Sequence, residues 1–207
     1  MIHLLKKVPN DITIACSGGP DSMVVLDFLN NGRRNIKVAH FDHGTYHGRE
    51  ATKFVHDYCR RNDIPIILGE LSLDIPTGRS KEDFWREQRY NFFSSIPGPI
   101  VTAHHLDDVV EWWVFSSLHG QSRLIPYQNK NVIRPFLLVT KDELLSWARN
   151  KNVRYITDPS NKETRYMRNF IRHQMMPDIV EVNPGIRTML KKKLVNKYTE
   201  EEENKNG

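Results

Sequence analysis

Short apolar runs separated by longer amphipathic segments organise the first two thirds of the chain. Four runs have the length and composition of buried strands, and they cover residues 11–16, 36–41, 65–71 and 100–103. The segments after them repeat apolar residues at helical spacing, over about 22–31, 48–62, 81–93 and the stretch beyond residue 103. Because parallel strands require crossover helices and lie buried on both faces, this alternation predicts an α/β fold. We expect an open, mostly parallel five-stranded sheet with helices on both faces.

The pattern changes after about residue 130, where a small helical C-terminal extension is predicted to pack on the sheet. Thr140 and Glu143 form a potential capping box at the start of a helix. The turn cluster DPSN at 158–161 precedes a basic helix from about Lys162 to Met176, which Pro177 should end. The last 17 residues, KKKLVNKYTEEEENKNG, are almost free of apolar side chains, so we expect a frayed and solvated charged tail at 191–207.

The segment IACSGGPDSMVVL at 14–26 places two glycines between a strand and a helix. In open α/β sheets, ligands bind outside the carboxyl ends of the strands. Gly18 and Gly19 allow backbone N–H groups to surround a phosphate, and a helix starting near Asp21 adds its positive end. Ser17 and Ser22 add hydroxyl donors. The loop has no lysine of the G-x-x-x-x-G-K-[ST] type, so it differs from the common phosphate loop, but it still predicts a nucleotide phosphate site.

Asp107, Asp108 and Glu111 place three carboxylates at the start of one predicted helix. Oxygen ligands of this kind suit Mg²⁺, and a carboxylate here could instead hold the ammonium group of a lysine substrate. The alternative is an acidic first turn that merely complements the helix dipole.

Arginines, histidines and tryptophans give less specific signals. Arg86 and Arg89 lie one helical turn apart and could bind a phosphate or a developing oxyanion, or simply form an exposed charged face. Trp112 and Trp113 are expected in the core or an interface. Five histidines lie near predicted strand ends: His40, His43, His47, His104 and His105. They could bind a nucleotide or cap the sheet. A zinc site has less support, because no cysteine lies nearby in the sequence.

Composition adds modest limits. The net charge of +5 permits a polyanionic partner, and arginines alternate with aromatic residues between Arg154 and Arg187, which suits phosphates and unstacked bases. Two isolated cysteines, Cys16 and Cys59, indicate a reducing, cytoplasmic setting. No apolar stretch is long enough to predict a membrane span or a secretory signal.

Six blocks in this order resemble the tRNA(Ile)-lysidine synthetase family within the PP-loop, or N-type ATP pyrophosphatase, superfamily. The resemblance covers about residues 11–185. The blocks are SGGPDS at 17–22, DHG at 42–44, REQRY at 86–90, TAHHLDD at 102–108 with Glu111, IRPF at 133–136, and DPSN at 158–161 followed by RNFIR at 168–172.

This resemblance implies a fold like that of the adenine nucleotide alpha hydrolases and a two-step reaction. ATP would adenylate the C2 carbonyl of the wobble cytidine in a CAU-anticodon tRNA(Ile), with pyrophosphate release. The ε-amine of free L-lysine would then displace AMP. The implied cofactors are ATP and Mg²⁺, and a homodimer is left open. The implied organisation is a PP-loop ATP pyrophosphatase domain at 1–135, a helical extension contacting tRNA at 136–190 and the tail.

The resemblance also implies roles for residues. Those implied in ATP binding are Ser17, Gly18, Gly19, Asp21, Ser22, His40 and His104; the metal would be held by Asp21, Asp107 and Asp108. The implied catalytic residues are Asp42, Arg86, Arg89, Asp108 and Glu111, and those contacting tRNA are Arg165, Arg168, Asn169 and Arg172.

Some positions depart from the family pattern, notably 45–50, Trp112 and His119, and the family's further C-terminal domains have only the charged tail as a counterpart. Three rival functions therefore stay open: a tRNA cytidine thiolase, which would need clustered cysteines; a small-molecule adenylating ligase; and a non-catalytic nucleotide- or tRNA-binding module.

Overall fold

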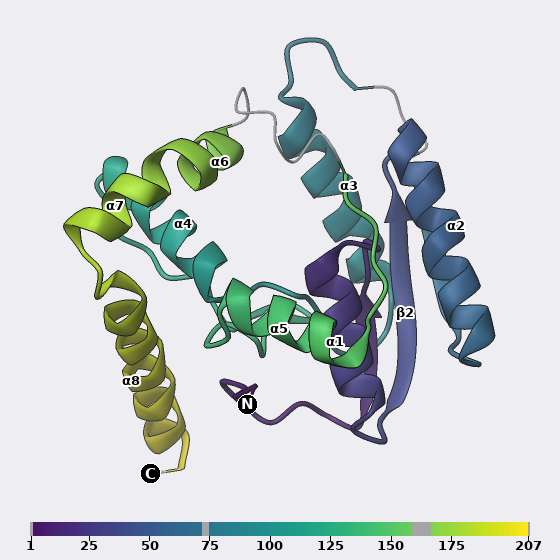
Figure 1. Ribbon diagram of the computed structural model, residues 1–207, viewed down its shortest axis with the longest axis horizontal. Coiled ribbons are helices and arrows are strands. Elements are labelled where there is room, and N and C mark those ends of the chain that lie inside the picture. The colour runs from purple at the N-terminus through teal and green to yellow at the C-terminus, as the bar shows by residue number, and fades with distance from the viewer. Residues whose placement is uncertain (1, 72–74, 159–166, 207) are drawn as a thin grey trace.

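The computed structural model describes residues 2–71, 75–158 and 167–206 (Figure 1). Within these ranges, the side chains of Glu82, Arg168 and residues 200–206 are not described. The strands are β1 (Asp11–Ala15), β2 (Asn35–Asp42), β3 (Ile66–Glu70), β4 (Ile100–Val101), β5 (Gln128–Asn129) and β6 (Val132–Ile133). The helices are α1 (Pro20–Asn30), α2 (Tyr46–Arg61), α3 (Lys81–Ser95), α4 (Leu106–Leu118), α5 (Lys141–Lys151), α6 (Met167–Phe170), the π-helical turn η2 (Ile171–Met175), α7 (Met176–Val182) and α8 (Ile186–Asn206).

The sheet has six strands in the order β3-β2-β1-β4-β6-β5, and every neighbouring pair is parallel except β5 with β6. The α/β fold and the mostly parallel sheet are confirmed, with one strand more than the five predicted. The extra element is one side of a β5–β6 hairpin with two residues in each strand, which is too short to produce an alternating pattern in the sequence.

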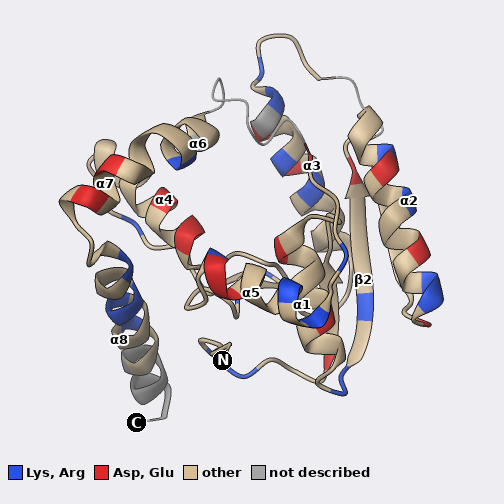
Figure 2. Cartoon of the chain, in the orientation of Figure 1, with Lys and Arg blue, Asp and Glu red and all other residues tan. Residues whose placement is uncertain are grey.

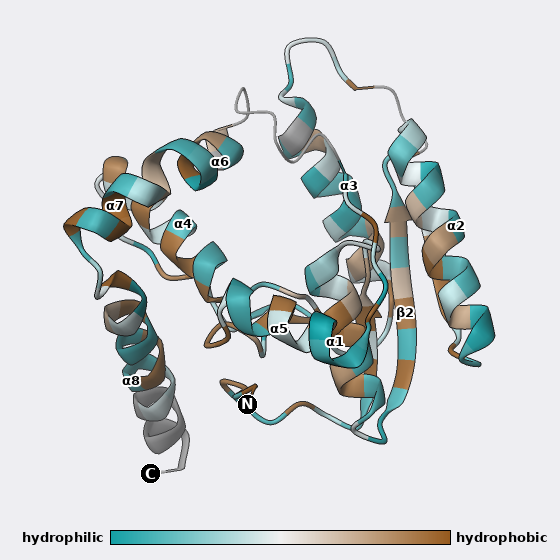
Figure 3. Cartoon of the chain, in the orientation of Figure 1, coloured by the Kyte–Doolittle hydropathy of each residue, from teal (hydrophilic) through white to brown (hydrophobic). Residues whose placement is uncertain are grey.

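Helices cover both faces of the sheet, as predicted. On one face, α1, α2 and α5 pack with β1 and β2 around Ile14, Leu26 and Val55, all with essentially no exposed surface. On the other face, Phe93 of α3 and Ile96, just after its end, pack against Ala39 of β2. Figure 3 shows apolar residues along both α1 and β2, which contribute to the core on the first of these faces.

The sheet order reverses beside β1, and this reversal positions the site. Ile14 of β1 pairs with Val38 of β2 on one side and with Val101 of β4 on the other. The chain therefore builds the sheet outward from β1 in one direction and returns to its other side with β4. The loops that leave β1 and β4 consequently meet at the topological switch point, where open α/β sheets bind ligands.

The C-terminal part differs from its prediction in two ways. The basic helix does not end at Pro177. A π-helical turn over Ile171–Met175 lets the N–H of Met176 donate to the carbonyl of Ile171, and Pro177 lies in the first turn of α7, where its missing N–H is least costly. This prediction was wrong because proline ends a helix only where its N–H is needed.

The prediction of a frayed tail is also wrong, because α8 runs through Asn206. Leu190, Leu194 and Tyr198 recur every fourth residue and are buried in a second core with α4, α7 and η2. The Tyr198 hydroxyl accepts a hydrogen bond from the backbone N–H of Tyr127 at 2.5 Å. Three buried side chains in a strongly charged segment are enough to fix a helix on the surface. In the part of the chain that is described, no helix has the length and apolarity to cross a bilayer.

Candidate active site

The glycine loop joins β1 to α1 at the switch point. Gly18 has a φ of +82°, and a Cβ there would lie 3.3 Å from side-chain atoms of Ile156 and Val55. The carbonyl of Gly18 accepts a hydrogen bond from the N–H of Ile156 at 3.0 Å. Position 18 thus combines a left-handed backbone conformation with close packing by Ile156 and Val55, and only glycine accommodates both without strain. Gly19 is the N-cap of α1 and Pro20 occupies its first turn.

The two serines of the loop bond mainly within it. The Ser22 hydroxyl accepts from the Ser17 N–H at 3.1 Å, and it lies 3.1 Å from the Gly19 carbonyl, to which it can donate. Ser17 Oγ lies 3.2 Å from Ser22 Oγ. These contacts hold the curve of the loop, so the groups left for a phosphate are chiefly backbone N–H groups at the start of α1.

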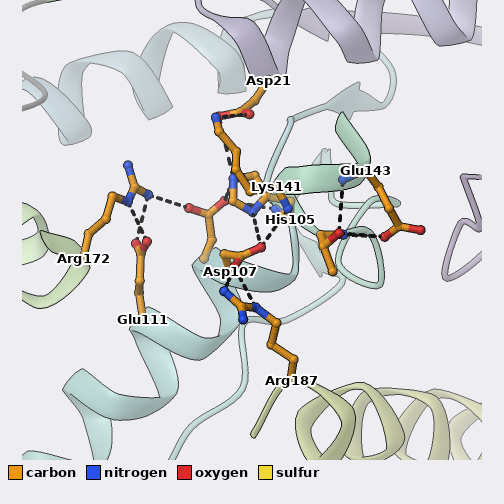
Figure 4. A network of polar contacts seen from close by, with 10 residues as sticks. Asp21, His105, Asp107, Glu111, Lys141, Glu143, Arg172 and Arg187 are labelled. Atoms are coloured by element: carbon orange, nitrogen blue, oxygen red, sulfur yellow. Dashed lines mark hydrogen bonds and ion pairs between the residues drawn. The ribbon is translucent and has the colours of Figure 1, made fainter. Parts of the chain in front are cut away.

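Asp21, from the first turn of α1, reaches the loop that follows β4. Its carboxylate forms an ion pair with Lys141, the first residue of α5, and lies 3.7 Å from Nε2 of His105 (Figure 4). Burial raises the pKa of Asp21, but His105 and Lys141 lower it by more, so the net shift is downward and the carboxylate is ionised at neutral pH.

The carboxylates at the start of α4 face cations from the C-terminal helices. Arg172 binds Glu111 in two-pronged fashion, with Nε to Oε1 at 2.6 Å and Nη2 to Oε2 at 3.0 Å. The same Nη2 lies 3.2 Å from Oδ1 of Asp108. Arg187 of α8 donates to Oδ1 of Asp107 at 2.6 and 2.9 Å (Figure 4). Glu111 and Asp108 are buried, so these pairs neutralise charges that would otherwise be costly in the interior.

His105 lies at the centre of this acidic group and is 3% exposed. Burial lowers its pKa, but the carboxylates of Asp108, Asp21 and Asp107 raise it by more, so the net shift is upward. Its Nε2 lies 3.7 Å from both Asp21 and Asp108. A proton on this imidazole therefore offsets part of the negative charge that the site concentrates.

The predicted magnesium ligands are engaged otherwise. Asp21 is paired with Lys141, Asp107 with Arg187 and Asp108 with Arg172. Among the described residues, no group of three or more histidine, cysteine or acidic side chains is arranged to hold a metal ion. In this arrangement the three carboxylates do not fit a magnesium ion, and no chemical step is assigned to one here.

A second polar group lies at the carboxyl end of β2. Asp42 accepts from the N–H of Gly44 at 2.8 Å and lies 3.2 Å from the Thr52 hydroxyl. A Cβ at Gly48 would come within 2.3 Å of Asp42 Oδ1, so glycine there leaves space for the carboxylate. His40 is buried beneath this group, with Nδ1 2.8 Å from the Cys16 carbonyl and Nε2 2.9 Å from the Thr52 hydroxyl. Both nitrogens of His40 face protein groups, which indicates that it supports the loop rather than reaching a ligand.

His43 and α3 complete this second group. His43 stacks on Trp85 with ring centroids 5.0 Å apart, and burial with the nearby Arg89 lowers its pKa to about 4. The guanidinium groups of Arg86 and Arg89 lie over the ring of Tyr90 at 5.6 and 5.9 Å. Figure 2 shows the basic residues of α3 and the acidic residues of α4 on separate elements. The predicted catalytic residues thus fall into two groups, Asp42 with Arg86 and Arg89, and Asp108 with Glu111.

The remaining predicted residues have mixed outcomes. His104 lies with Nδ1 2.8 Å from the Thr102 hydroxyl. Of the residues predicted to contact tRNA, Arg165 and the side chain of Arg168 lie outside the described part, and Asn169 lies in α6. Arg172 is described, and it is bound to the carboxylates of α4.

Three residues at the centre of the site were given no specific role by the sequence: His105, Lys141 and Arg187. His105 was considered only with the other histidines, as a nucleotide, capping or zinc residue, and its place among the carboxylates was not predicted. Lys141 lies 120 positions from its partner Asp21, and Arg187 lies 80 positions from Asp107. No local pattern in the sequence indicates pairs that are this distant.

Comparisons with known proteins identify the family of the chain. A family model described as a PP-loop domain matches residues 2–179. The tRNA(Ile)-lysidine synthase of Thermotoga maritima is 34% identical over 194 residues, covering 84% of this chain and 46% of that protein. The enzyme of that name from Nitrosomonas europaea is 33% identical over 201 residues, covering 88% and 44%. The chain therefore spans less than half the length of these curated relatives.

Solved structures show the same fold at low identity. The U34-tRNA thiolase NcsA from Methanococcus maripaludis superposes with a TM-score of 0.71 at 17% identity, over 94% of this chain and 72% of that one. An NH3-dependent NAD synthetase from Campylobacter jejuni gives a TM-score of 0.50 at 11% identity, over 93% and 86%. At these identities the likeness concerns the fold alone.

Proposed function

Because the chain belongs to the PP-loop domain family, we propose that it uses ATP to convert the wobble cytidine of a CAU-anticodon tRNA(Ile) to lysidine. In the first step, the C2 carbonyl oxygen attacks the α-phosphorus of ATP and the bond to pyrophosphate breaks. In the second step, the ε-amine of lysine attacks C2, the C–O bond to AMP breaks and the amine loses a proton. The partners in this proposal are tRNA(Ile) and free L-lysine.

The observation that carries the proposal is the meeting of the glycine loop and the α4 carboxylates at one switch point. Asp21 follows the loop after β1 and His105 follows β4, and their side chains lie 3.7 Å apart. The loop supplies backbone N–H groups for phosphates, and Asp108 with Glu111 lies beside it. A nucleotide and a cationic co-substrate could therefore be held at the same edge of the sheet.

The α4 carboxylates are suited to hold the lysine side chain. Asp108 and Glu111 already bind the guanidinium of Arg172, so their geometry stabilises a positive group. We assign to Asp42, at the end of the adjacent strand β2, the role of accepting the proton that the amine loses; its carboxylate is held by the N–H of Gly44. Arg86 and Arg89 of α3 would neutralise charge on the leaving phosphates.

A thiolase reaction is the alternative raised by the fold of the Methanococcus protein. That chemistry requires an accessible thiolate. Both cysteines of this chain are buried, and burial raises the pKa of Cys16 and raises that of Cys59 to about 12. Neither thiol is suited to form a persulfide, so lysidine formation is favoured.

The test is a nucleoside analysis of tRNA incubated with the purified protein, ATP and lysine. We expect pyrophosphate release that requires the CAU-anticodon transcript, and lysidine at the wobble position by mass spectrometry. Asp108→Asn should abolish lysidine formation, whereas the matched exposed variant Asp57→Asn should retain it. Pyrophosphate release without lysidine would support the adenylation step but refute lysine as the nucleophile. No turnover with any transcript would refute the whole proposal. Sedimentation of the same preparation would show whether the protein forms a homodimer, which the sequence leaves open.

A further inference from the structure

The outer face of α4 carries an aromatic stripe, which consists of Trp112, Phe115 and His119. The rings of Trp112 and Phe115 stack with centroids 5.6 Å apart and planes 28° apart. The rings of Phe115 and His119 lie 4.5 Å apart at 41°. His119 is fixed further because its Nδ1 lies 2.8 Å from the Phe115 carbonyl. Three rings in successive contact on one helix thus form a continuous surface.

This stripe lies on the same side of α4 as the site carboxylates. Trp112 follows Asp108 by four residues, Phe115 follows Glu111 by four, and His119 follows Phe115 by four. Side chains four residues apart lie one above the other on a helix, with about 6 Å of rise between them. The stripe therefore begins one turn from the carboxylates and extends away from them along α4.

The stripe is not simply part of the core. Trp113 and one edge of the stripe, Phe115, pack against the second apolar core, whereas Trp112 belongs to none of the three apolar clusters of the described residues. Trp112 and Phe115 are half-buried, and His119 is exposed. Of the two expectations for Trp112, core or interface, the core is not supported, and its half-buried ring is open to a partner.

Arginines occur near both ends of the stripe. The backbone N–H of Arg123, an exposed residue that follows α4, donates to the Ser116 hydroxyl at 2.8 Å, which holds the main chain of this arginine close to the last turn of α4. Arg172 lies at the other end of the stripe, on Glu111 and Asp108. Flat rings flanked by guanidinium groups suit nucleobases attached to phosphates, because the rings stack on bases and the cations neutralise the backbone.

We infer that the aromatic stripe of α4 is a stacking surface for unpaired nucleobases of the RNA substrate. The inference rests on the proposed function and extends it: the stripe binds bases that neighbour the reacting one, at a distance set by the turns of α4. It predicts a preference for loop RNA over paired RNA, because only unstacked bases offer their faces to the rings.

The test measures the affinity of the ATP-free protein for three RNAs: a CAU anticodon stem-loop, a stem-loop with a different anticodon, and a blunt duplex. Trp112→Leu and Phe115→Leu should each weaken binding of both stem-loops by about 5- to 150-fold, the range that loss of one base–aromatic stack produces. Trp112→Phe should restore most of the affinity. Val182→Ala, which alters an apolar side chain that is 86% exposed on α7, should leave it unchanged.

The outcomes separate this inference from the proposed function. A loss of stem-loop binding in the Trp112 and Phe115 variants supports the stripe even where no lysidine forms. Unchanged stem-loop affinity in both variants overturns it, as does equal weakening on the duplex. A change in sedimentation of Trp112→Leu without a change in RNA affinity also overturns it, because the stripe would then bind protein. Quenching of Trp112 fluorescence by the stem-loop, lost in Trp112→Phe, provides a readout that does not depend on how the leucine variants fold.

Discussion

Replacing Arg172 distinguishes a residue that stabilises the site from one that only contacts RNA. The sequence predicted a tRNA contact, whereas the structure pairs Arg172 with Glu111 and Asp108, whose side chains are 5% and 8% exposed. Arg172→Gln would leave two buried carboxylates without their shared cation. Removing one partner of a fully buried pair costs about 3–5 kcal/mol. Because the Arg172 side chain is 36% exposed, water can partly replace it, and we expect about 2 kcal/mol.

The assay is thermal unfolding of the protein without RNA, ATP or lysine. For a domain of this size, 2 kcal/mol corresponds to a decrease in Tm of about 4–8 °C. Arg172→Lys keeps the charge but loses the two-pronged geometry, so it should lower stability by about half as much. In the double variant with Glu111→Gln, the cost of losing Arg172 should be smaller than in the wild type, because one uncompensated charge is gone.

The control is Arg60→Gln, which removes an exposed pair with Asp57 at 3.9 Å and should change stability by less than about 0.5 kcal/mol. A Tm for Arg172→Gln within 1 °C of wild type would refute the reasoning. That result, together with lost RNA affinity, would return Arg172 to the role that the sequence predicted.

Further predictions concern the loop, His43 and α8. Gly18→Ala should lower stability by about 1–2 kcal/mol, measured by urea unfolding, because φ is +82° and Ile156 lies close. Gly19→Ala, whose Cβ would lie 3.5 Å from the nearest neighbour, is the control for stability. Gly18→Ala should also raise the KM for ATP. Folding lowers the pKa of His43 from 6.5 to about 4, so as the pH falls the unfolded chain takes up this proton before the folded one. The free energy of unfolding should therefore fall by up to about 3 kcal/mol as the pH drops from 6.5 to 4, and His43→Asn should flatten this dependence. Leu194→Ala should cost about 2–5 kcal/mol by calorimetry, because Leu194 is fully buried, whereas a truly frayed tail would show no effect.

The sequence was sufficient to predict the fold because its signals are local and repeated. The apolar runs predicted four of the six strands, β1 to β4. Thr140 with Glu143 forms the capping box expected from its spacing, with the Thr140 N–H donating to Glu143 at 2.8 Å. The hairpin of β5 and β6 was missed because two residues per strand give no period. The helical tail was missed because three buried residues are diluted by charges, although Leu190, Leu194 and Tyr198 share a spacing of four.

The sequence predicted the residue types of the site better than their partners. Asp21, Asp107, Asp108 and Glu111 were identified from their motifs, since carboxylates beside a glycine loop indicate phosphate or amine chemistry. Their cations could not be identified, because an ion pair between residues 60 to 120 positions apart depends on how helices pack. For the same reason Arg172 was assigned to tRNA, as the family resemblance implies, and not to the carboxylates that it contacts.

The origin of these cations bears on the domain division predicted near residue 135. Lys141, Arg172 and Arg187 all come from beyond that point, and each binds a carboxylate from before it. Without the residues beyond 135, Glu111 and Asp108 would lose Arg172, and Asp21 and Asp107 would lose Lys141 and Arg187. The helical extension therefore neutralises part of the charge of the site as well as covering it. A substrate cation that enters between Asp108 and Glu111 must displace Arg172, and its binding would then be coupled to the position of α6 and η2.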